Sequence, residues 1–281
     1  GNILTKLTEQ TGNFSTGNVD PKDLSDVNIY SDFAECLKEE QPDACIIAVH
    51  TALHYEMAEM ALLAGANVFI EKPFSKNKVL MVGHVVRFMP AYETLKKWID
   101  SDEYGRLEFL TLSRFSGVPI WGQWKERQKE FGSSGGALFD LVIHDIDFAQ
   151  WVCGVPDRIE ARCLPGKLSN HDYVSALWSY NNSDVVVKID GGNTFHAGYP
   201  FHAGFSARFE DASVFFSSQD PHNIKVTTDT KTILVSGGDA NEGFSNELYY
   251  FADCVLQGIQ PVKCTPESAL NSIRICHEHA L

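Results

Sequence analysis

The spacing of apolar residues changes along the chain and divides it into two parts. In the first part, short apolar runs of strand character alternate with segments of helical spacing. From about residue 158 onward the apolar residues alternate in steps of two, with polar turn residues between the runs. A single hydrophobic core stops growing near ~250–300 residues, so two domains are expected for a chain of 281 residues. We place them at residues 1–85 and 86–281.

The first domain contains a strand–helix–strand unit. The apolar run at residues 43–49 lies between Pro42 and His50 and is typical of a buried parallel strand. Residues 54–65 have helical spacing and stop at Gly65, and residues 68–70 form a second strand. Such a βαβ unit holds ligands at the carboxyl ends of its strands. A shorter helix with Ser31 as its N-cap is expected over residues 32–40.

The next apolar run, residues 79–82, follows very soon after residues 68–70. Neighbouring parallel strands are normally joined by a crossover of a dozen residues or more, usually a helix. No helical pattern separates these two runs, and no strand with a Gly-rich turn opens the sequence. We therefore infer that a crossover helix is missing between Asn77 and Lys78, and that this first domain is incomplete in the sequence.

A strongly apolar helix is predicted over residues 136–152, and it carries a polar stripe. Asp140, His144 and Asp147 lie at positions i, i+4 and i+7. Polar groups on a buried helix need partners or a function, because burying them unpaired costs free energy. A histidine with a pKa near neutrality is the usual general acid/base. A structural Asp–His hydrogen bond and a metal site are the alternatives, although His144 and Asp147 offer too few ligands for zinc alone.

The second domain is predicted to be an α+β unit built on a large, mainly antiparallel sheet. Two helices, at residues 246–257 and 266–281, are expected to close it. One face of such a sheet packs on helices and the other stays open. We expect the open face to bury apolar residues against a second copy, forming a homodimer or homotetramer. Those residues are Val185, Val187, Phe215 and Val226. The expected strands span residues 158–163, 173–180, 184–191, 201–209, 212–217, 224–228 and 232–235.

Composition excludes several classes of protein. The formal net charge of −14 opposes binding to nucleic acid or to anionic lipid. No stretch is apolar enough to span a membrane, and the first residues lack the features of a signal peptide, so a cytoplasmic protein is expected. The seven cysteines are scattered and odd in number, which favours reduced thiols over disulfides or a zinc site.

Four motifs, taken in order, resemble those of the Gfo/Idh/MocA family of NAD(P)-dependent oxidoreductases. They occupy residues 48–54, 64–73 (ending Glu71-Lys72-Pro73), 82–88 and 135–147. The resemblance covers about residues 30–155 and implies a Rossmann-type domain, an open-faced sheet, and NAD or NADP as cofactor. The residue that selects between the two nucleotides is not found in the sequence.

The resemblance also implies roles for individual residues. Lys72 stands at the end of a strand before Pro73, whose ring disfavours helical geometry at Lys72. An ammonium group there is suited to stabilising a developing alkoxide. Lys72, Asp140 and His144 are the expected catalytic residues, and no metal is expected. The expected cofactor-binding residues are His50, His54, Glu71 and Lys72, and the expected substrate-binding residues are Arg87, Trp124 and His202.

The resulting hypothesis is an oxidoreductase that acts on a secondary alcohol of a sugar, cyclitol or related polyol. Hydride would pass between the alcohol carbon and the nicotinamide, His144 would exchange the hydroxyl proton, and Asp140 would orient the reacting groups. A non-catalytic sensor of the same fold is one alternative, but such a binder would have no reason to keep all three catalytic residues. Redox-neutral glycoside cleavage or epimerisation with tightly held NAD is the other.

Overall fold

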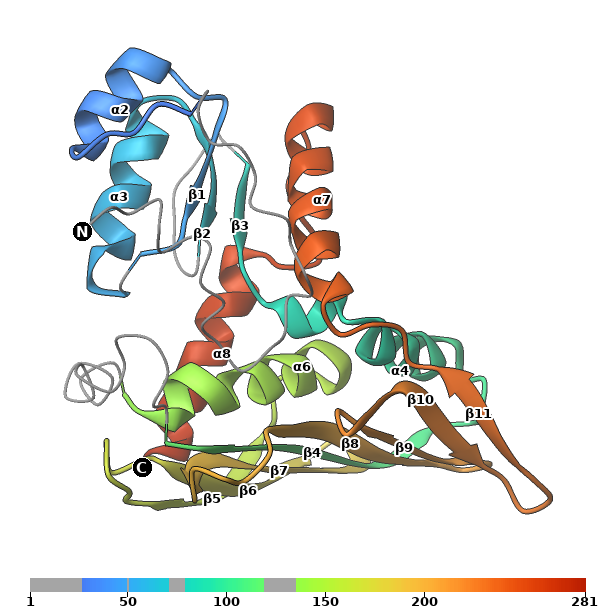
Figure 1. Ribbon diagram of the computed structural model, residues 1–281. Coiled ribbons are helices and arrows are strands. Elements are labelled where there is room, and N and C mark those ends of the chain that lie inside the picture. The colour runs from blue at the N-terminus through green and yellow to red at the C-terminus, as the bar shows by residue number, and fades with distance from the viewer. Residues whose placement is uncertain (1–26, 50, 71–78, 119–134) are drawn as a thin grey trace.

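A computed structural model describes residues 27–49, 51–70, 79–118 and 135–281. The described chain forms two β-sheets that lie one above the other in Figure 1, with helices between and beside them. The small sheet comes from the first part of the chain and the large sheet from the second, and both are reached by helices near the C-terminus. The chain therefore has an α/β architecture in which a parallel sheet precedes a large mixed sheet.

The small sheet is parallel, in the order β1 (Ala44–Ile47), β2 (Asn67–Ile70) and β3 (Leu80–Val82). Helices α2 (Phe33–Glu40) and α3 (Thr51–Leu63) pack beside it. This confirms the predicted βαβ unit. Two details differ from prediction: Asp32, rather than Ser31, caps α2 through a bond from Glu35 N, and Ile46 of β1 is 60% exposed. β1 is the edge strand of the described sheet, which explains the exposure.

The two strands with the unusually short separation are direct neighbours. Val68, Phe69 and Ile70 of β2 pair in parallel with Leu80, Met81 and Val82 of β3. The backbone N–H of Gly83 donates to the carbonyl of Ile70 at 2.9 Å, so the carboxyl ends of both strands lie at the same edge. Their connection runs through residues 71–78, which lie outside the described residues.

The large sheet has eight described strands in the order β11-β10-β9-β8-β4-β7-β6-β5. The antiparallel character is confirmed except at the centre, where β4 pairs in parallel with β7. The sequence pattern missed β4 and the helix before it, α4 (Pro90–Ser101). The strands are β4 (Leu107–Gly117), β5 (Arg158–Leu164), β6 (Tyr173–Tyr180), β7 (Ser183–Phe195), β8 (His202–Phe209), β9 (Ser213–Ser217), β10 (Asp220–Thr227) and β11 (Thr232–Ser236).

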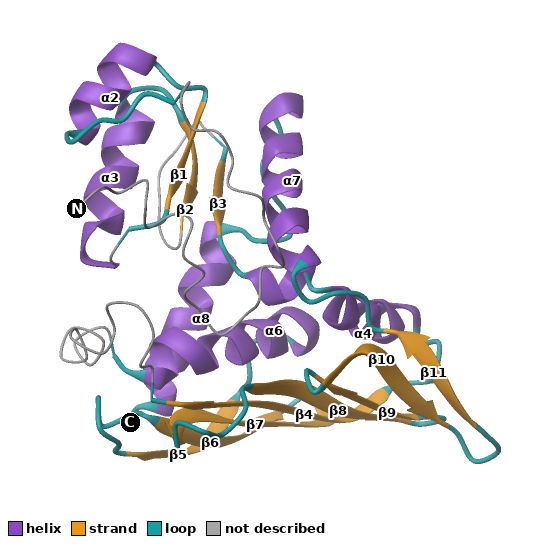
Figure 2. Ribbon diagram, in the orientation of Figure 1, coloured by secondary structure: helices purple, strands orange, loops and turns teal. Residues whose placement is uncertain are grey.

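The helices of the second part cover only one face of this sheet. Figure 2 shows α4, α6 (Ile143–Cys153) and α8 (Pro266–His279) on the same side, where their apolar residues join the main core. The predicted residues of the open face need correction. Val185, Val187 and Val226 are 9%, 0% and 1% exposed, whereas Phe215 is 51% exposed. The sequence does not reveal which residues of β7 face the helices, because valine occupies both faces of this strand at positions 185–187.

The helix α7 (Glu242–Gln257) returns to the small sheet and stands beside β3 in Figure 1. Phe251 and Cys254 of α7 form a second apolar cluster with Phe69 and Met81 of the small sheet. The rings of Phe69 and Phe251 meet edge to face at 5.6 Å between centroids. Residues near the C-terminus are therefore part of the core that supports β2 and β3.

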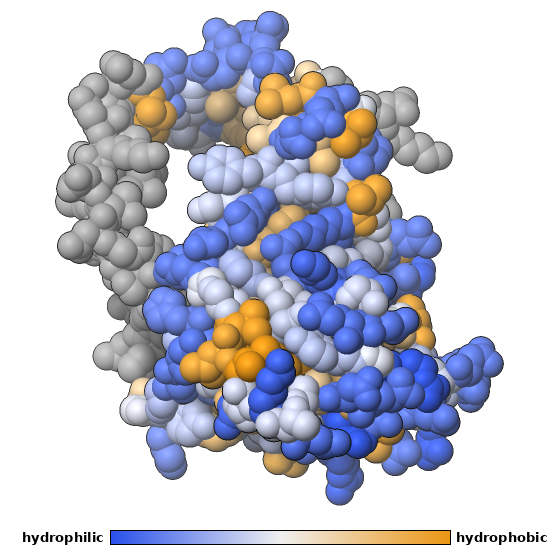
Figure 3. All heavy atoms as spheres, turned by 90° about the vertical axis from the view of Figure 1, so that its right-hand side faces the viewer, coloured by the Kyte–Doolittle hydropathy of each residue, from blue (hydrophilic) through white to orange (hydrophobic). Residues whose placement is uncertain are grey.

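No helix in the described ranges is long and apolar enough to cross a lipid bilayer. Figure 3 views the molecule from the side that is on the right in Figure 1. Its hydrophobic patches are small and are interrupted by hydrophilic residues.

Candidate active site

Two glycines and a π-turn open the helix that carries the predicted catalytic residues. Gly135 and Gly136 have φ angles of +102° and +70°. A β-carbon on Gly136 would lie 1.8 Å from Ser169 Oγ, so the turn requires glycine. Residues Leu138–Val142 form a single turn of π-helix, called the π-turn below, and α6 follows directly. Such turns occur often at functional sites. The sequence pattern predicted a continuous α-helix and did not reveal the π-turn.

The predicted polar stripe runs from the surface into the core. Asp140 lies in the π-turn and is exposed, and His144 is half-buried in the first turn of α6. Asp147, one turn later, is 0% exposed. The stripe therefore has two parts: Asp140 and His144 are accessible to a ligand, and Asp147 belongs to the interior.

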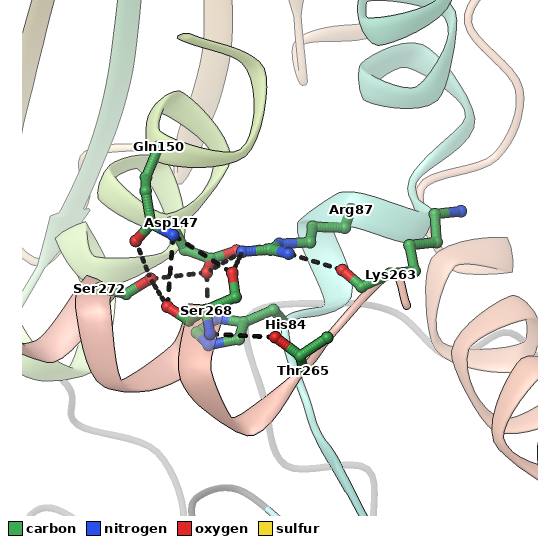
Figure 4. Close-up of polar contacts among 8 residues, drawn as sticks. All are labelled: His84, Arg87, Asp147, Gln150, Lys263, Thr265, Ser268 and Ser272. Carbon is green, nitrogen blue, oxygen red and sulfur yellow. Dashed lines mark hydrogen bonds and ion pairs between the residues drawn. The ribbon is translucent and has the colours of Figure 1, made fainter. Parts of the chain in front are cut away.

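Asp147 forms a buried ion pair with Arg87, which is 1% exposed (Figure 4). Arg87 Nε donates to Oδ2 of Asp147 at 2.7 Å, and Nη2 donates to Oδ1 at 2.6 Å. Arg87 also donates to the carbonyl of Lys263 at 2.6 Å and to Ser268 Oγ at 2.5 Å. All three of its guanidinium nitrogens thus donate hydrogen bonds within the protein. This placement favours a structural role for Arg87 over the substrate contact expected from sequence.

Two further residues contact the same carboxylate. Ser272 Oγ of α8 donates to Asp147 Oδ1 at 2.7 Å, and His84 Nε2 lies 3.4 Å from that oxygen. Burial by itself would raise the pKa of Asp147. Electrostatic interactions with His84 and Arg87, with hydrogen bonds from Arg87 and Ser272, outweigh this effect and hold the pKa below its usual value. Asp147 is therefore a carboxylate at neutral pH.

A second buried ion pair holds α6 from the other side. Arg114 of β4 and Asp145 of α6 are 3% and 0% exposed. Arg114 Nε and Nη2 donate to the two carboxylate oxygens of Asp145 at 2.8 and 3.0 Å. Two aspartates of one helix, separated by Ile146, thus reach in two directions, Asp145 to the large sheet and Asp147 toward the segment that follows β3.

The expected cofactor-binding residues lie at or near the carboxyl ends of the parallel strands. Glu71 and Lys72 directly follow β2, but they and His50 lie outside the described residues, as does Trp124. His54 is described: its Nε2 lies 2.7 Å from the carbonyl oxygen of Val49, and the side chain is 5% exposed. This contact ties the start of α3 to the end of β1.

His202 lies on the opposite face of the large sheet from α6. Its Nε2 is 3.0 Å from Ser113 Oγ, and its ring stacks on Phe115 with the centroids 5.6 Å apart. Successive residues of a strand point to opposite faces, and Arg114, between these two residues, points to α6. The structure therefore separates His202 from His144 and does not support a shared substrate contact.

Sequence reasoning missed two other features near the site. Arg114 follows Leu110 and Leu112 on the buried face of β4, and its partner is only apparent once the strand is placed beneath α6. Asn193 of β7 is 2% exposed, and its Oδ1 has no hydrogen-bond partner among the described residues. Its backbone N–H donates to the carbonyl of Asp172, whose neighbour His171 accepts a bond from Leu138 N. Asn193 is thus linked to the turn that carries Asp140.

The described residues contain no group of three His, Cys, Asp or Glu side chains that would hold a metal ion. The polar groups around α6 instead form pairs that link separate elements. What the site offers is an exposed carboxylate and a half-buried imidazole near the start of α6, and two buried ion pairs join that helix to neighbouring elements.

Comparison with protein-family models finds matches along most of the chain. Residues 10–91 match the model described as an oxidoreductase family with an NAD-binding Rossmann fold, and residues 92–215 match the GFO/IDH/MocA C-terminal domain. The chain belongs to the Gfo/Idh/MocA family of oxidoreductases. The family resemblance noted from the four sequence motifs is therefore confirmed, together with the NAD-binding Rossmann-type domain.

Relatives of known activity share about a quarter of their residues with this family member. A scyllo-inositol 2-dehydrogenase (NAD(+)) of Bacillus subtilis (strain 168) is 25% identical over 271 residues, which cover 84% of this chain and 74% of the relative. An inositol 2-dehydrogenase of Rhizobium meliloti (strain 1021) is 27% identical over 210 residues, covering 66% and 60%.

Solved structures show the same fold at lower identity. A UDP-N-acetylglucosamine 3-dehydrogenase of Acidithiobacillus ferrooxidans has a TM-score of 0.71 at 19% identity and covers 90% of this chain and 81% of its own. A levoglucosan dehydrogenase in complex with NADH and levoglucosan has a TM-score of 0.74 at 19% identity, covering 89% and 81%.

Proposed function

We propose that this family member oxidises a secondary alcohol of a sugar, cyclitol or related polyol, or reduces the corresponding ketone, with NAD or NADP. The observation that carries the proposal is the placement of α6. The segment that follows β3 contacts α6, so the carboxyl edge of the parallel sheet lies next to the helix that carries His144. Ligands of parallel α/β sheets bind at that edge. The inositol dehydrogenases among the relatives favour the same class of substrate.

The nicotinamide end of a dinucleotide fits this arrangement. The parallel order of β1, β2 and β3 brings their carboxyl ends together, and Gly83 follows β3 at that edge without a side chain to block it. We assign Glu71, Lys72, His50 and His54 to hold the nucleotide there. When bound, the nicotinamide supplies the position that accepts or donates hydride.

In the oxidation direction, an imidazole nitrogen of His144 removes the hydroxyl proton while the carbon–hydrogen bond is broken and its electron pair leaves with the hydrogen. The oxygen keeps the electrons of the former O–H bond and forms the carbonyl. Lys72 stabilises negative charge on that oxygen, and Asp140 orients the hydroxyl group. Asn193 brings a buried amide to the same region.

Absorbance of reduced nicotinamide, recorded while the full-length protein is screened against polyols and aldoses with each nucleotide, tests the proposal. We expect reduction of one nucleotide by at least one polyol. Lys72→Met should then lower kcat by roughly 10²–10³-fold while the nucleotide Kd stays within tenfold, because a contact to a developing oxyanion is lost. Nucleotide binding without turnover of any compound would instead support the sensor. A tightly bound nucleotide that returns to its starting redox state would support redox-neutral chemistry.

We also propose that the protein forms a dimer, or a tetramer of dimers, through the open face of the large sheet. That face exposes Phe109, Leu177 and Phe215, and a groove of about 350 Å³ lies between Phe109, Phe215 and Lys225. Monomers rarely expose apolar area of this kind without a partner. Light scattering should give at least twice the monomer mass, and Phe215→Asp should reduce it. Leu256→Asp, a matched change at an exposed residue of α7, should not.

A reducing, cytoplasmic compartment is proposed as well. None of the seven cysteines, which all lie in the described ranges, forms a disulfide, and Cys254, Cys264 and Cys276 are buried. Disulfides persist mainly in oxidising compartments. Thiol titration after denaturation of protein purified without reductant should find all seven thiols.

A further inference from the structure

A single polar cluster joins the end of the parallel sheet to the helix that carries His144. Its residues come from three places in the chain. His84 and Arg87 follow β3, Asp147 and Gln150 belong to α6, and Ser268 and Ser272 belong to α8. Figure 4 shows these side chains converging on the Asp147 carboxylate. Arg87 and Asp147 are 60 positions apart in sequence, so the cluster holds the segment after β3 against a helix that is distant in sequence.

The hydrogen bonds of the cluster restrain one another, because Arg87 and Ser272 each bind more than one partner. Arg87 uses three guanidinium nitrogens on Asp147, Ser268 and the carbonyl of Lys263. Ser272 Oγ contacts both Asp147 Oδ1 and Gln150 Oε1, at 2.7 and 3.1 Å. A planar guanidinium that donates to a carboxylate through two nitrogens has a fixed orientation relative to it. The position of the segment after β3 relative to α6 is therefore fixed as well.

We propose that Asp147 and Arg87 are positioning residues, which set the distance between His144 and the nicotinamide edge of the parallel sheet. This inference rests on the proposed function. Arg87 lies five positions after the last residue of β3, and Asp147 lies three positions after His144. Their ion pair is thus a short connection between the two halves of the reaction site. Misplacement of reacting groups by about 1 Å costs on the order of 10²-fold in rate.

The second ion pair of α6 is a matched control for this idea. Asp145 and Asp147 are both 0% exposed, and each binds an arginine through two nitrogens. Arg114, however, joins α6 to β4 of the same core, where Val142, Ile146 and Phe148 already hold the helix. Loss of Asp145 should weaken that core without changing the relation of α6 to the parallel sheet.

The experiment compares Asp147→Asn with Asp145→Asn in the full chain. With the polyol that the wild type converts fastest, Asp147→Asn should lower kcat roughly 10- to 100-fold. The nucleotide Kd should stay within about threefold, because no residue at the nucleotide edge is changed. The primary deuterium isotope effect on kcat, measured with substrate labelled at the reacting carbon, should rise because the hydride step becomes slower. Asp145→Asn should leave kcat within about threefold and the isotope effect unchanged.

Hydrogen exchange followed by mass spectrometry adds a readout that needs no substrate. Asp147→Asn should speed exchange in residues 80–88, whereas Asp145→Asn should speed it in residues 107–117. If Asp147→Asn does not fold, Ser272→Ala is used, which removes one hydrogen bond from Asp147 and should lower kcat about threefold to tenfold. Equal kcat values in the Asp147 and Asp145 variants, or unchanged exchange in residues 80–88, would overturn the inference. A wild type that converts no polyol, with the exchange difference intact, would overturn the proposed function and leave the structural coupling standing.

Discussion

The two ion pairs of α6 have the same chemistry and connect different parts of the molecule. Arg114–Asp145 joins α6 to the sheet on which it lies, and Arg87–Asp147 joins it to the end of the parallel sheet. In the first pair, Asp145 accepts hydrogen bonds only from Arg114 among the described residues. The second is one contact in a cluster that includes His84 and Ser272.

The difference shows that burial and geometry alone do not reveal what an ion pair does. A buried pair is often no better for stability than apolar residues of similar volume, because both charges must lose their hydration. Its value then depends on which elements it orients. Here one pair orients a helix within a core, and the other orients that helix relative to a second sheet.

The largest expected effect is on kcat and comes from replacing His144, the residue that the Arg87–Asp147 pair is proposed to position. His144→Asn removes the proposed acid/base group, so kcat should fall by roughly 10²–10⁴-fold. The limb of the pH–rate profile that reports this group should disappear. Steady-state kinetics between about pH 5 and pH 9 measures both. A variant with the wild-type profile would assign the proton transfer to another residue, and the Arg87 pair would then have no histidine to position.

Replacing each arginine sharpens the comparison through stability. Arg114→Ala and Arg87→Ala each leave a buried carboxylate without its cation, which costs about 3–5 kcal/mol. Arg114→Ala should be the more damaging of the two, because Asp147 keeps Ser272 and His84 while Asp145 keeps no other donor among the described residues. Urea unfolding near neutral pH compares the free energies of unfolding of the two variants. Arg87→Ala should nonetheless have the lower kcat. If Arg114→Ala lost more of both stability and kcat, the division of roles between the two pairs would be contradicted.

The fall in the free energy of unfolding at low pH should depend on Asp147. Its pKa is held below the usual value, so its contribution is complete above the unfolded-state pKa of about 4 and is lost as the pH falls through the lower folded-state pKa. Asp147→Asn should therefore flatten the loss of stability below about pH 4. Urea midpoints for wild type and variant on either side of that pH provide the measurement. Parallel curves would show that Asp147 is not a depressed carboxylate.

The smallest effect is expected at Tyr92, which lies beside the Arg114 pair. Burial raises the pKa of the Tyr92 hydroxyl well above its ordinary range. Tyr92 and Arg114 both line a small cavity of about 20 Å³, enough for one water molecule. Tyr92→Phe should change the free energy of unfolding by only about 0.5–1.5 kcal/mol and leave kcat unchanged. A loss of turnover would mean that the Arg114 side also controls the reaction geometry.

Much of the fold was predictable because local periodicity carries it. The bounds predicted for β6 agree with the structure, and the predicted helices near the C-terminus appear as α7 and α8. The central strand β4 was not predicted, since the polar residues Arg114 and Ser116 occupy its buried face after Leu112 and hide the alternation. Its neighbours β7 and β8 lie far away in sequence, so nothing local indicates its place.

The candidate site was predictable only in part. Asp140 and His144 were found because polar residues on an apolar helix are conspicuous. Asp147 belonged to the same pattern, but its partner could not be inferred from spacing, because the pairing with Arg87 depends on how two sheets are placed. Arg87 therefore received a substrate role that its buried ion pair does not support. The face on which His202 lies was equally invisible without the strand register.

The return of α7 to the small sheet has a consequence for how the chain folds as it is made. Phe69 and Met81 are covered by Phe251 and Cys254, which leave the ribosome some 170 residues after Met81. At about 5–20 residues per second, the small sheet waits roughly ten to forty seconds with these apolar residues uncovered. We therefore expect the first part of the chain to be prone to association during synthesis, and a fragment ending before α7 should aggregate when expressed alone.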